Sequence, residues 1–361
     1  MGSPTDPPAL APAPATLGHV KHRPPPAARW RARERNDRLP RYTRRDFLKL
    51  AGVAVAGSTV AGSTVLAACG GRAVQNPPAS LAQRSVAPPA PAGSAYLAVA
   101  HGPDPAAITR AAVAAVGGMK RFVARGAEVI VKPNICTDGR APQYAATTNP
   151  VVVATLVELA LQAGAGRVRV MDQPFGGTSS SAYQTSGIGA AVAAAGGEMV
   201  VMSPLGYDHV AIPQGRSITS WDVYRDLLSA GTVIDVPIAK THGSAGLTLG
   251  CKNLMGVVRD PGGFHSDLSQ RIADLVSLVR PQLTVIDAVR ILTANGPTGG
   301  DLADVRVTDT VIASHDIVAA DARATALFGL TPSDVPAIAA TAAMGLGKMS
   351  VPARQIKTIR L

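Results

Sequence analysis

The sequence is poor in aromatic side chains, charged side chains and cysteine. Phe, Trp and Tyr together make up 4% of its 361 residues, so the stacking platforms on which single-stranded nucleic acids bind are scarce. Charged residues make up only 16% and hydrophobic residues 47%, which excludes a collagen, a coiled coil and a wholly disordered chain. The three cysteines lie far apart, without the Cys-x-x-Cys spacing of a zinc site.

The formal net charge of +11 is concentrated near the N-terminus. Residues 1–50 carry 11 Lys and Arg against 4 Asp and Glu, whereas the remaining residues carry 24 against 20. A near balance of this kind is ordinary for a soluble domain, because a nucleic-acid binder needs a clustered basic excess. We therefore expect no nucleic-acid partner.

The first 70 residues have the order of an export signal. Arg44 and Arg45 precede Phe-Leu-Lys, and residues 51–68 then contain no charge before Cys69. This order resembles a twin-arginine signal, and residues 66–70, Leu-Ala-Ala-Cys-Gly, resemble a lipobox whose cysteine is lipidated. The resemblance implies the twin-arginine export machinery and, through Cys69, the lipid bilayer as partners, with the protein anchored on the outer face of the cytoplasmic membrane. The alternatives are a cleaved, secreted or periplasmic soluble protein and an uncleaved membrane anchor.

Composition divides the chain into three expected segments. Residues 1–68 form a disordered basic arm and signal peptide, because residues 1–42 are rich in Pro, Ala and Arg and lack apolar periodicity. Residues 69–95 form the lipidated cysteine and a Pro/Ala-rich tether. Residues 96–361 form a single α/β domain.

From residue 96 onward, short β-rich runs alternate with alanine-rich segments of helical spacing. The runs are 96–100, 128–132, 167–171, 199–203, 232–237, 283–287 and 310–314, and the helical segments are 104–117, 150–164, 183–195, 221–229, 266–279, 317–328 and 334–344. The strands are near-continuous Val and Ile runs, as expected when both faces of a sheet are covered. The pattern predicts the α/β class, with a doubly wound, mostly parallel sheet and helices on both faces.

Unusual polar residues follow the predicted strands directly. Lys132 and Asn134 come after the second strand, Asp172 after the third, Lys240 and His242 after the fifth, and Asp287 closes the sixth. Ligands of such sheets bind in the crevice outside the carboxyl ends of the strands. The sequence therefore predicts a polar crevice at this edge.

Several separated phrases of the chain resemble the domain of unknown function 362 (DUF 362) family. They are Val131–Asn134, Thr147–Val153, Pro237–His242, Cys251–Gly256, Leu283–Ala288, Asn295–Pro297 and His315–Asp321. The resemblance covers roughly residues 96–345 and implies no agreed reaction. Family members often carry a ferredoxin-like segment with clustered cysteines, which this chain lacks. We therefore expect no iron–sulfur cluster within this chain, because Cys136 and Cys251 alone cannot hold one.

Three of the six lysines that follow Cys69 lie in these phrases, in a segment with 18 arginines. Lys132, Lys240 and Lys252 therefore indicate that a compact ammonium is favoured there over a guanidinium. Such a lysine can neutralise an anion, act as a base or form a Schiff base. Solvated or salt-bridged lysines are the structural alternative. We interpret the three as groups that bind or act on a small anionic ligand, which Asn134 and Asn253 orient.

Asp172, Asp287 and His242 are candidates for proton transfer or for holding a divalent metal. Carboxylate and imidazole ligands suit Mg, Mn or a transition metal, although each carboxylate can instead cap a helix. Together with Lys132 and Lys240 they complete the catalytic candidates. No other cofactor is indicated.

The remaining candidates lie in turns. Gly176 and Gly177 precede Thr178 and three serines, and their backbone N–H groups can cradle an anion or simply form a flexible turn. Asn295 is a further ligand-binding candidate. His265, after a Gly-Gly turn, is either a lid residue or an exposed loop histidine. Cys136 and Cys251 can pair as a disulfide or stay buried and reduced.

Three functional hypotheses fit these observations. The first is an exported, membrane-tethered α/β enzyme that acts on a small anionic ligand. The second is a non-catalytic solute-binding lipoprotein that uses the same crevice. The third is a redox protein whose iron–sulfur cluster lies on a partner chain.

Overall fold

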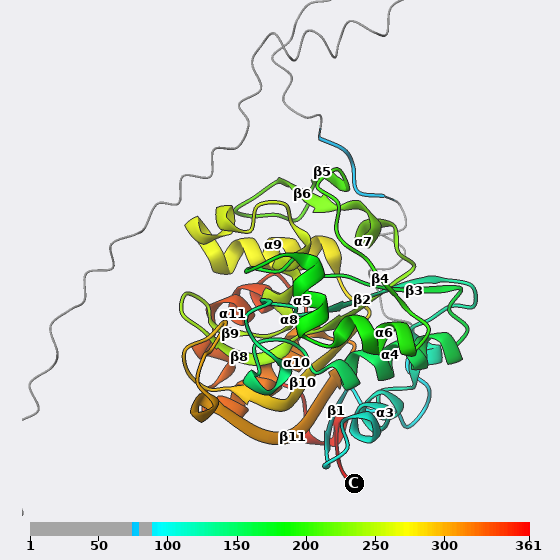
Figure 1. Ribbon diagram of the computed structural model, residues 1–361. Coiled ribbons are helices and arrows are strands. Elements are labelled where there is room, and N and C mark those ends of the chain that lie inside the picture. Colours follow the sequence, from blue (N-terminus) through cyan, green and yellow to red (C-terminus); the bar gives the residue numbers. More distant parts are fainter. Residues whose placement is uncertain (1–73, 79–88) are drawn as a thin grey trace, which may run out of the picture. The chain divides into compact units, whose positions relative to one another are not determined.

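The computed structural model describes residues 74–78 and 89–361. The expected signal, with Arg44, Arg45 and Cys69, lies outside these residues. A ten-stranded sheet fills the centre of the described chain, and a two-stranded sheet lies at one end (Figure 1). The strands are β1 (Leu97–His101), β2 (Glu128–Pro133), β3 (Arg167–Val170), β4 (Glu198–Met199), β5 (Tyr207–Ala211), β6 (Ser220–Tyr224), β7 (Thr232–Val236), β8 (Ile238–His242), β9 (Gly246–Thr248), β10 (Leu283–Leu292), β11 (Val305–Ser314) and β12 (Ile356–Arg360).

The large sheet is mixed, and most of its strands run parallel. Its order is β12-β1-β11-β10-β7-β2-β3-β4, and β8 joins it beside β10 and pairs with β9. The five neighbours β10, β7, β2, β3 and β4 are parallel. Only β11, between β1 and β10, and β9, on β8, pair antiparallel with their neighbours. The predicted α/β class and mostly parallel sheet are confirmed.

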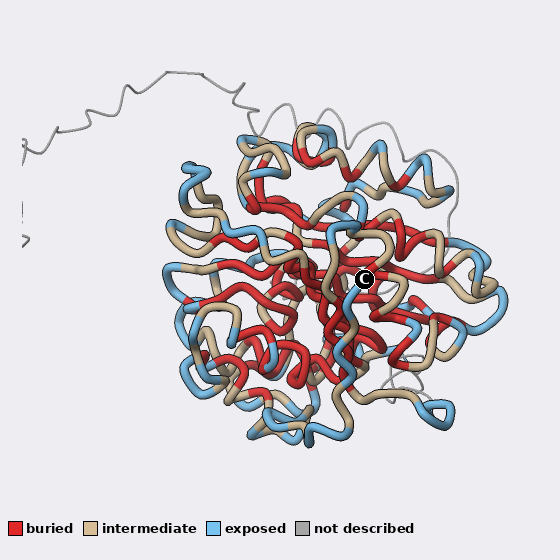
Figure 2. Tube along the Cα trace, turned by 90° about the horizontal axis from the view of Figure 1, so that it is seen from below, coloured by how far each residue is buried: buried red, intermediate tan, exposed pale blue. Residues whose placement is uncertain are grey.

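Helices cover both faces of the sheet. They are α3 (Pro105–Ala115), α4 (Pro150–Gln162), α5 (Ser179–Thr185), α6 (Ile188–Ala194), α7 (Arg225–Ser229), α8 (Gly250–Asn253), α9 (Leu268–Val279), α10 (Ile317–Ala324) and α11 (Pro336–Ala343). Successive residues of a strand point to opposite faces, so Leu97 and Val99 pack in one apolar core and Ala98 and Ala100 in the other. Helices α3 to α6 cover one core and α9 to α11 the other. Figure 2 shows the buried strands surrounded by more exposed loops.

Several helix starts follow from local sequence. Asp104 accepts a hydrogen bond from the N–H of Ala106, and Asn149 accepts one from Val151, at the starts of α3 and α4. In both helices the next residue is proline, whose fixed φ suits the first turn. Asp316 caps α10 in the same way through the N–H of Ala319.

Two predicted helices differ from the structure. The segment 183–195 is two helices, because Gly187 adopts φ 70° between α5 and α6 and ends the first. The segment 221–229 begins as strand β6, which pairs with β5 in register Val210↔Trp221, and becomes helical only from Arg225. The aromatic and β-branched residues of 220–224 favour a strand, and this preference prevails over the apolar spacing.

The strands also extend beyond the prediction. Strand β10 continues to Leu292, so Asp287 lies within this strand and does not close it. Strands β5, β8, β9 and β12 were not predicted, and β4 is only two residues long. Gln75, in the expected tether, pairs with β5: its N–H donates to His209 O at 2.8 Å, and its carbonyl accepts from Ala211 N at 2.8 Å. Among the described residues, no helix has the length and apolar character that crossing a bilayer requires.

Candidate functional site

A cavity of about 300 Å³ opens around the carboxyl ends of β2, β3 and β8. Helix α8 and the loop that follows it form the opposite wall. The structure brings seven of the eleven predicted catalytic and ligand-binding residues to this one cavity: Lys132, Asn134, Asp172, Lys240, His242, Lys252 and Asn253. Their placement follows from parallel strands that end at the same edge, as the crevice rule requires.

Lys132 Nζ is surrounded by three protein oxygens, two as hydrogen-bond acceptors and one in an ion pair. It lies 2.7 Å from Asp172 Oδ1, 3.0 Å from Asn253 Oδ1 and 3.0 Å from the carbonyl oxygen of Pro133. Asp172 Oδ2 accepts the N–H of Ile135 at 2.6 Å. Burial raises the pKa of Asp172, and the ammonium of Lys132 opposes this shift. The pair is therefore a buried, fully bonded ion pair between two strands.

Lys240 is saturated in the same way, but by neutral oxygens. Its Nζ donates to Asn134 Oδ1 at 2.9 Å, Ala146 O at 2.6 Å and Pro297 O at 2.9 Å. The side chain is fully buried, and this burial lowers its pKa. Among the described residues, no carboxylate forms an ion pair with this ammonium.

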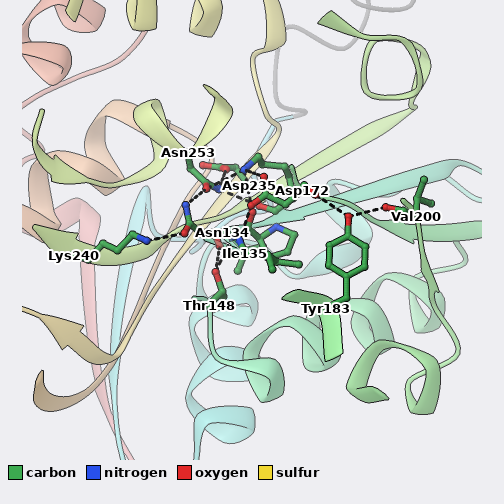
Figure 3. Close-up of polar contacts among 12 residues, drawn as sticks. Asn134, Ile135, Thr148, Asp172, Tyr183, Val200, Asp235, Lys240 and Asn253 are labelled. Atoms are coloured by element: carbon green, nitrogen blue, oxygen red, sulfur yellow. Dashed lines mark hydrogen bonds and ion pairs between the residues drawn. The ribbon is translucent and has the colours of Figure 1, made fainter. Parts of the chain in front are cut away.

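Two asparagines link the lysines (Figure 3). Asn134 Nδ2 donates to Asn253 Oδ1 at 3.0 Å, and Asn253 Nδ2 donates to Asp235 Oδ1 at 2.7 Å. Lys132, Asn134, Asp172, Lys240 and Asn253 thus form one hydrogen-bonded network, which we call the saturated cluster. Sequence analysis missed Asp235; its only signal is a carboxyl within the apolar strand 232–236.

Gly256 allows α8 and its following turn to approach the saturated cluster. A methyl group at this position would lie 2.0 Å from Asp172 Oδ1 and 2.7 Å from Lys132 Nζ. No side chain fits at such distances, so the last residue of the phrase Cys251–Gly256 must be glycine for steric reasons.

Lys252 differs from the other two lysines of the cavity. It lines the cavity from α8, and its side chain makes no hydrogen bond or ion pair with any residue that the structure describes. Burial lowers its pKa to about 8, and the positive charges of Lys240 and Lys132 act in the same direction. Its ammonium is therefore available to a ligand.

His242 and Thr248 lie with Lys252 at the cavity wall. The Nδ1 of His242 accepts from the N–H groups of Ser244 at 3.2 Å and Ala245 at 3.3 Å, so in the neutral ring the proton is on Nε2. Burial lowers the pKa of His242 to about 4, which keeps the ring neutral near pH 7. Thr248 is 3% exposed, and its Oγ1 has no partner among the described residues. We call His242, Thr248 and Lys252 the open rim.

Four candidates do not line the cavity. Asp287 accepts the N–H groups of Asn149 at 2.7 Å and Val289 at 3.0 Å, so it fixes the start of α4. A methyl group at Gly177 would lie 2.0 Å from the Asp138 carboxylate, so the protein's own anion occupies the turn at Gly176 and Gly177. Asn295 donates to Asp304 Oδ2 at 2.7 Å.

Metal-binding and disulfide chemistry gain no support from these contacts. Within residues 74–78 and 89–361, no three His, Cys, Asp or Glu side chains are grouped so that they could hold a metal ion. Cys136 and Cys251 are both free and buried, and only Cys136 lines the cavity. His265, the candidate lid residue, lines the cavity and is exposed.

The chain is similar to several known proteins. A thylakoid-associated protein of Synechocystis sp. is 29% identical over 246 residues, which cover 64% of this chain and 72% of that protein. Among solved structures, the lactate racemase apoprotein from Thermoanaerobacterium thermosaccharolyticum is 11% identical, with a TM-score of 0.39 over 63% of this chain. A protein from Thermotoga maritima is also 11% identical, with a TM-score of 0.34 over 57% of this chain.

The chain spans 56% and 55% of those two structures. The family model matches residues 129–326, a range that contains both the saturated cluster and the open rim. The chain therefore belongs to the family described as Domain of unknown function (DUF362).

Proposed function

We propose that the cavity binds a small anionic ligand and that the protein is an enzyme that acts on it. The observation that carries this proposal is Lys252, a half-buried ammonium in the cavity without a partner among the described residues. A buried cation without a counter-charge is unfavourable, so an anionic ligand that pairs with it gains a strong, charge-assisted hydrogen bond.

The charges around the cavity support an anion. Asp172 compensates Lys132, whereas Lys240 donates hydrogen bonds to three neutral oxygens and also interacts with the Cys136 side chain. Burial raises the pKa of Asp235 well above its ordinary value, which favours the neutral form of this acid. Two ammonium groups, on Lys240 and Lys252, therefore remain uncompensated beside the cavity, and their field attracts negative charge.

The two regions have different roles in this proposal. The saturated cluster has few donors left for a ligand, so it holds the walls and supplies the charge of Lys240. Lys252 contacts the anionic group, and the Nε2–H of His242 and the hydroxyl of Thr248 supply further donors. Because the pKa of Lys252 is about 8, its amine can gain or lose a proton near neutral pH, as acid–base catalysis requires.

Calorimetric titration with acetate and with phosphate tests the proposal. We expect Lys252→Met to weaken binding at least tenfold, because a charged hydrogen bond contributes about 1.5–3 kcal/mol. Lys357→Met is the matched control, since Lys357 is exposed on β12. Equal affinities of Lys252→Met and the unmodified protein would remove the basis of the proposal. If an anion captured from a cell extract is recovered unaltered after long incubation, the protein is a solute-binding lipoprotein and not an enzyme.

We also propose that the protein is exported by the twin-arginine route and anchored through lipidated Cys69. The order of Arg44, Arg45, the uncharged run 51–68 and Cys69 supports this proposal, as does a relative that is thylakoid-associated. Growth with radiolabelled palmitate should label the protein in the membrane fraction. Cys69→Ser should abolish the label, and replacing both arginines by lysine should retain the precursor in the cytoplasm. An unlabelled protein that leaves the membrane in high salt would contradict the anchor.

A further inference from the structure

We propose that the ligand carries an aldehyde or ketone carbonyl beside its anionic group and that Lys252 forms an imine with this carbonyl. The inference rests on the proposed function, and it assigns a substrate class to the same cavity. It concerns Lys252 alone, because this lysine can lose a proton without breaking hydrogen bonds within the protein, whereas the other two lysines of the cavity cannot.

Deprotonation of Lys132 or Lys240 would remove existing hydrogen bonds. Each ammonium lies 2.6–3.0 Å from three protein oxygens, through three hydrogen bonds at Lys240 and through two hydrogen bonds and one ion pair at Lys132. A neutral amine would leave a buried acceptor without its donor, or the Asp172 carboxylate without its counter-charge. Lys252 donates to none of the described residues. Lys252 can therefore lose a proton without loss of a hydrogen bond within the protein. The neutral amine that results has the free lone pair that a nucleophile requires.

The environment of Lys252 also lowers the cost of losing this proton. Burial, together with the positive charges of Lys240 and Lys132, lowers its pKa to about 8. Compared with an ordinary lysine at 10.5, the neutral fraction at pH 7 is then roughly 300-fold larger. A lysine desolvated beside another cation is a general arrangement for an amine nucleophile.

Helix α8 holds the backbone of Lys252 in a fixed position. Asp321 accepts the N–H of Gly250 at 2.7 Å and the N–H of Cys251 at 2.8 Å, and this ties down the first turn. The residue after Lys252 is Asn253, whose side chain is bound into the saturated cluster. Both backbone neighbours of Lys252 are thus anchored, so its side chain starts from a preorganised backbone.

The open rim supplies a group that polarises a carbonyl. His242 lines the same cavity and presents Nε2–H from a neutral ring, since backbone N–H groups occupy Nδ1. A neutral donor can stabilise developing charge on the carbonyl oxygen without adding a third positive charge beside the amine. The partner-free hydroxyl of Thr248 is a second donor on the same wall.

The step is balanced without an oxidant or reductant. The neutral Lys252 nitrogen attacks the carbonyl carbon, the C=O π electrons move to the oxygen, and the oxygen gains one proton as the nitrogen loses one. The hydroxyl of the resulting carbinolamine gains a second proton and leaves as water, while the nitrogen lone pair forms the C=N bond and the nitrogen loses its other proton. The net change is amine plus carbonyl to imine plus water. The anionic group of the substrate stays in the field of Lys240.

Reductive trapping of the full chain tests the inference. The protein is incubated at pH 7 with glyoxylate, the smallest anionic aldehyde, and sodium cyanoborohydride, and the rate of adduct formation at each lysine is measured by peptide mass spectrometry. Lys120 and Lys357 are exposed and act as internal controls within the same sample. Lys252→Arg keeps the charge but cannot form an imine, and acetaldehyde replaces glyoxylate as the neutral control. A thiol adduct at Cys136 is not a substrate for this reduction, so it does not interfere.

We expect Lys252 to be labelled at least tenfold faster than Lys120 or Lys357, with a larger glyoxylate-to-acetaldehyde ratio, and Lys252→Arg to show labelling only at the exposed lysines. Labelling of Lys252 at the rate of the exposed lysines overturns the inference, whether or not the arginine variant folds. If acetate binding still depends on Lys252 in that case, the proposed function stands and only the imine is lost. If acetate binding is also unaffected by Lys252→Met, both are lost.

Discussion

The saturated cluster and the open rim share one cavity and some of the same residue types, yet they differ in how far their polar groups are bonded. Lys132 donates two hydrogen bonds and forms an ion pair with Asp172, and Lys240 donates three hydrogen bonds, whereas Lys252 donates none to the described residues. The difference shows that a lysine in a family phrase can be part of the scaffold or part of the binding surface. The decisive property is the number of free donors, which residue identity alone does not give.

The largest expected difference between the two regions is in stability. Lys132→Met leaves the buried carboxylate of Asp172 without its counter-charge, and breaking a buried pair in this way costs about 3–5 kcal/mol. Lys252→Met removes no hydrogen bond to a described residue, so its free energy of unfolding should change by less than about 1 kcal/mol. Urea denaturation of both variants at pH 7 measures the contrast. Equal losses would mean that the two lysines are not distinguished by their bonding.

The second prediction concerns the steric basis of the saturated cluster. Gly256→Ala places a methyl group 2.0 Å from Asp172 Oδ1, so the Lys132–Asp172 pair must separate, and overpacking of this kind costs about 1–3 kcal/mol. Gly243→Ala is the matched control in a cavity-side loop, because no atom lies within 4 Å of the added methyl group. Thermal unfolding should show a lower midpoint for Gly256→Ala only. A normal midpoint in both would mean that the turn after α8 shifts freely.

The third prediction tests the role of the open rim through the pH dependence of anion binding. An anion pairs with the ammonium form of Lys252, so affinity for acetate should be constant below about pH 7 and fall as pH rises through about 8, the pKa of this lysine. The limiting loss is about tenfold per pH unit. Lys252→Arg should bind with little change up to pH 9, because a guanidinium stays charged. Identical pH profiles for the two proteins would assign the titration to another group.

The sequence predicts features set by residues that are close together in the chain, and it does not predict contacts between residues that are far apart. Runs of Val and Ile, cap residues such as Asp104 and Asn149, and polar residues after strands are local signals, and they predicted the sheet and seven of the cavity residues. The partners of Lys240 come from residues 134, 146 and 297, far apart along the chain. No sequence pattern predicts whether the ammonium of a lysine such as Lys240 already has all its hydrogen-bond acceptors within the protein.

The misplaced candidates have the same cause. Asp287 was expected at a strand end, but β10 and β11, each ten residues long, pair from Thr284↔Ser314 to Leu292↔Val305 and carry it into the sheet interior. Gly176 and Gly177 have the composition of an anion cradle, but Asp138, more than thirty residues earlier in the chain, occupies that position. In both cases tertiary pairing decides what a locally plausible residue contacts.

The smallest expected effect separates two buried acids, Asp172 in the saturated cluster and Asp235 bonded to it. Asp172 forms an ion pair, whereas Asp235 accepts only from Asn253 Nδ2, and its Oδ2 has no partner among the described residues. Burial raises the pKa of Asp235 well above the ordinary 3.8, so the folded protein binds this proton more tightly than the unfolded chain. The associated stability is complete below pH 3.8 and is lost as pH rises through the folded pKa.

Asp235→Asn keeps the acceptor for Asn253 and removes the titrating proton. Its free energy of unfolding at pH 6 should therefore lie within about 1 kcal/mol of the unmodified protein, and it should decline less as pH rises from 5 to 8. Asp172→Asn is the matched comparison, because an amide leaves the ammonium of Lys132 buried without a counter-charge and should cost more at every pH. Urea denaturation across this pH range measures both. A large loss in the free energy of unfolding of Asp235→Asn at pH 6 would mean that Asp235 is ionised and pairs with the charge of Lys132. The saturated cluster would then contain a second carboxylate. Its negative charge would weaken the positive field of Lys240 and Lys252 in the cavity.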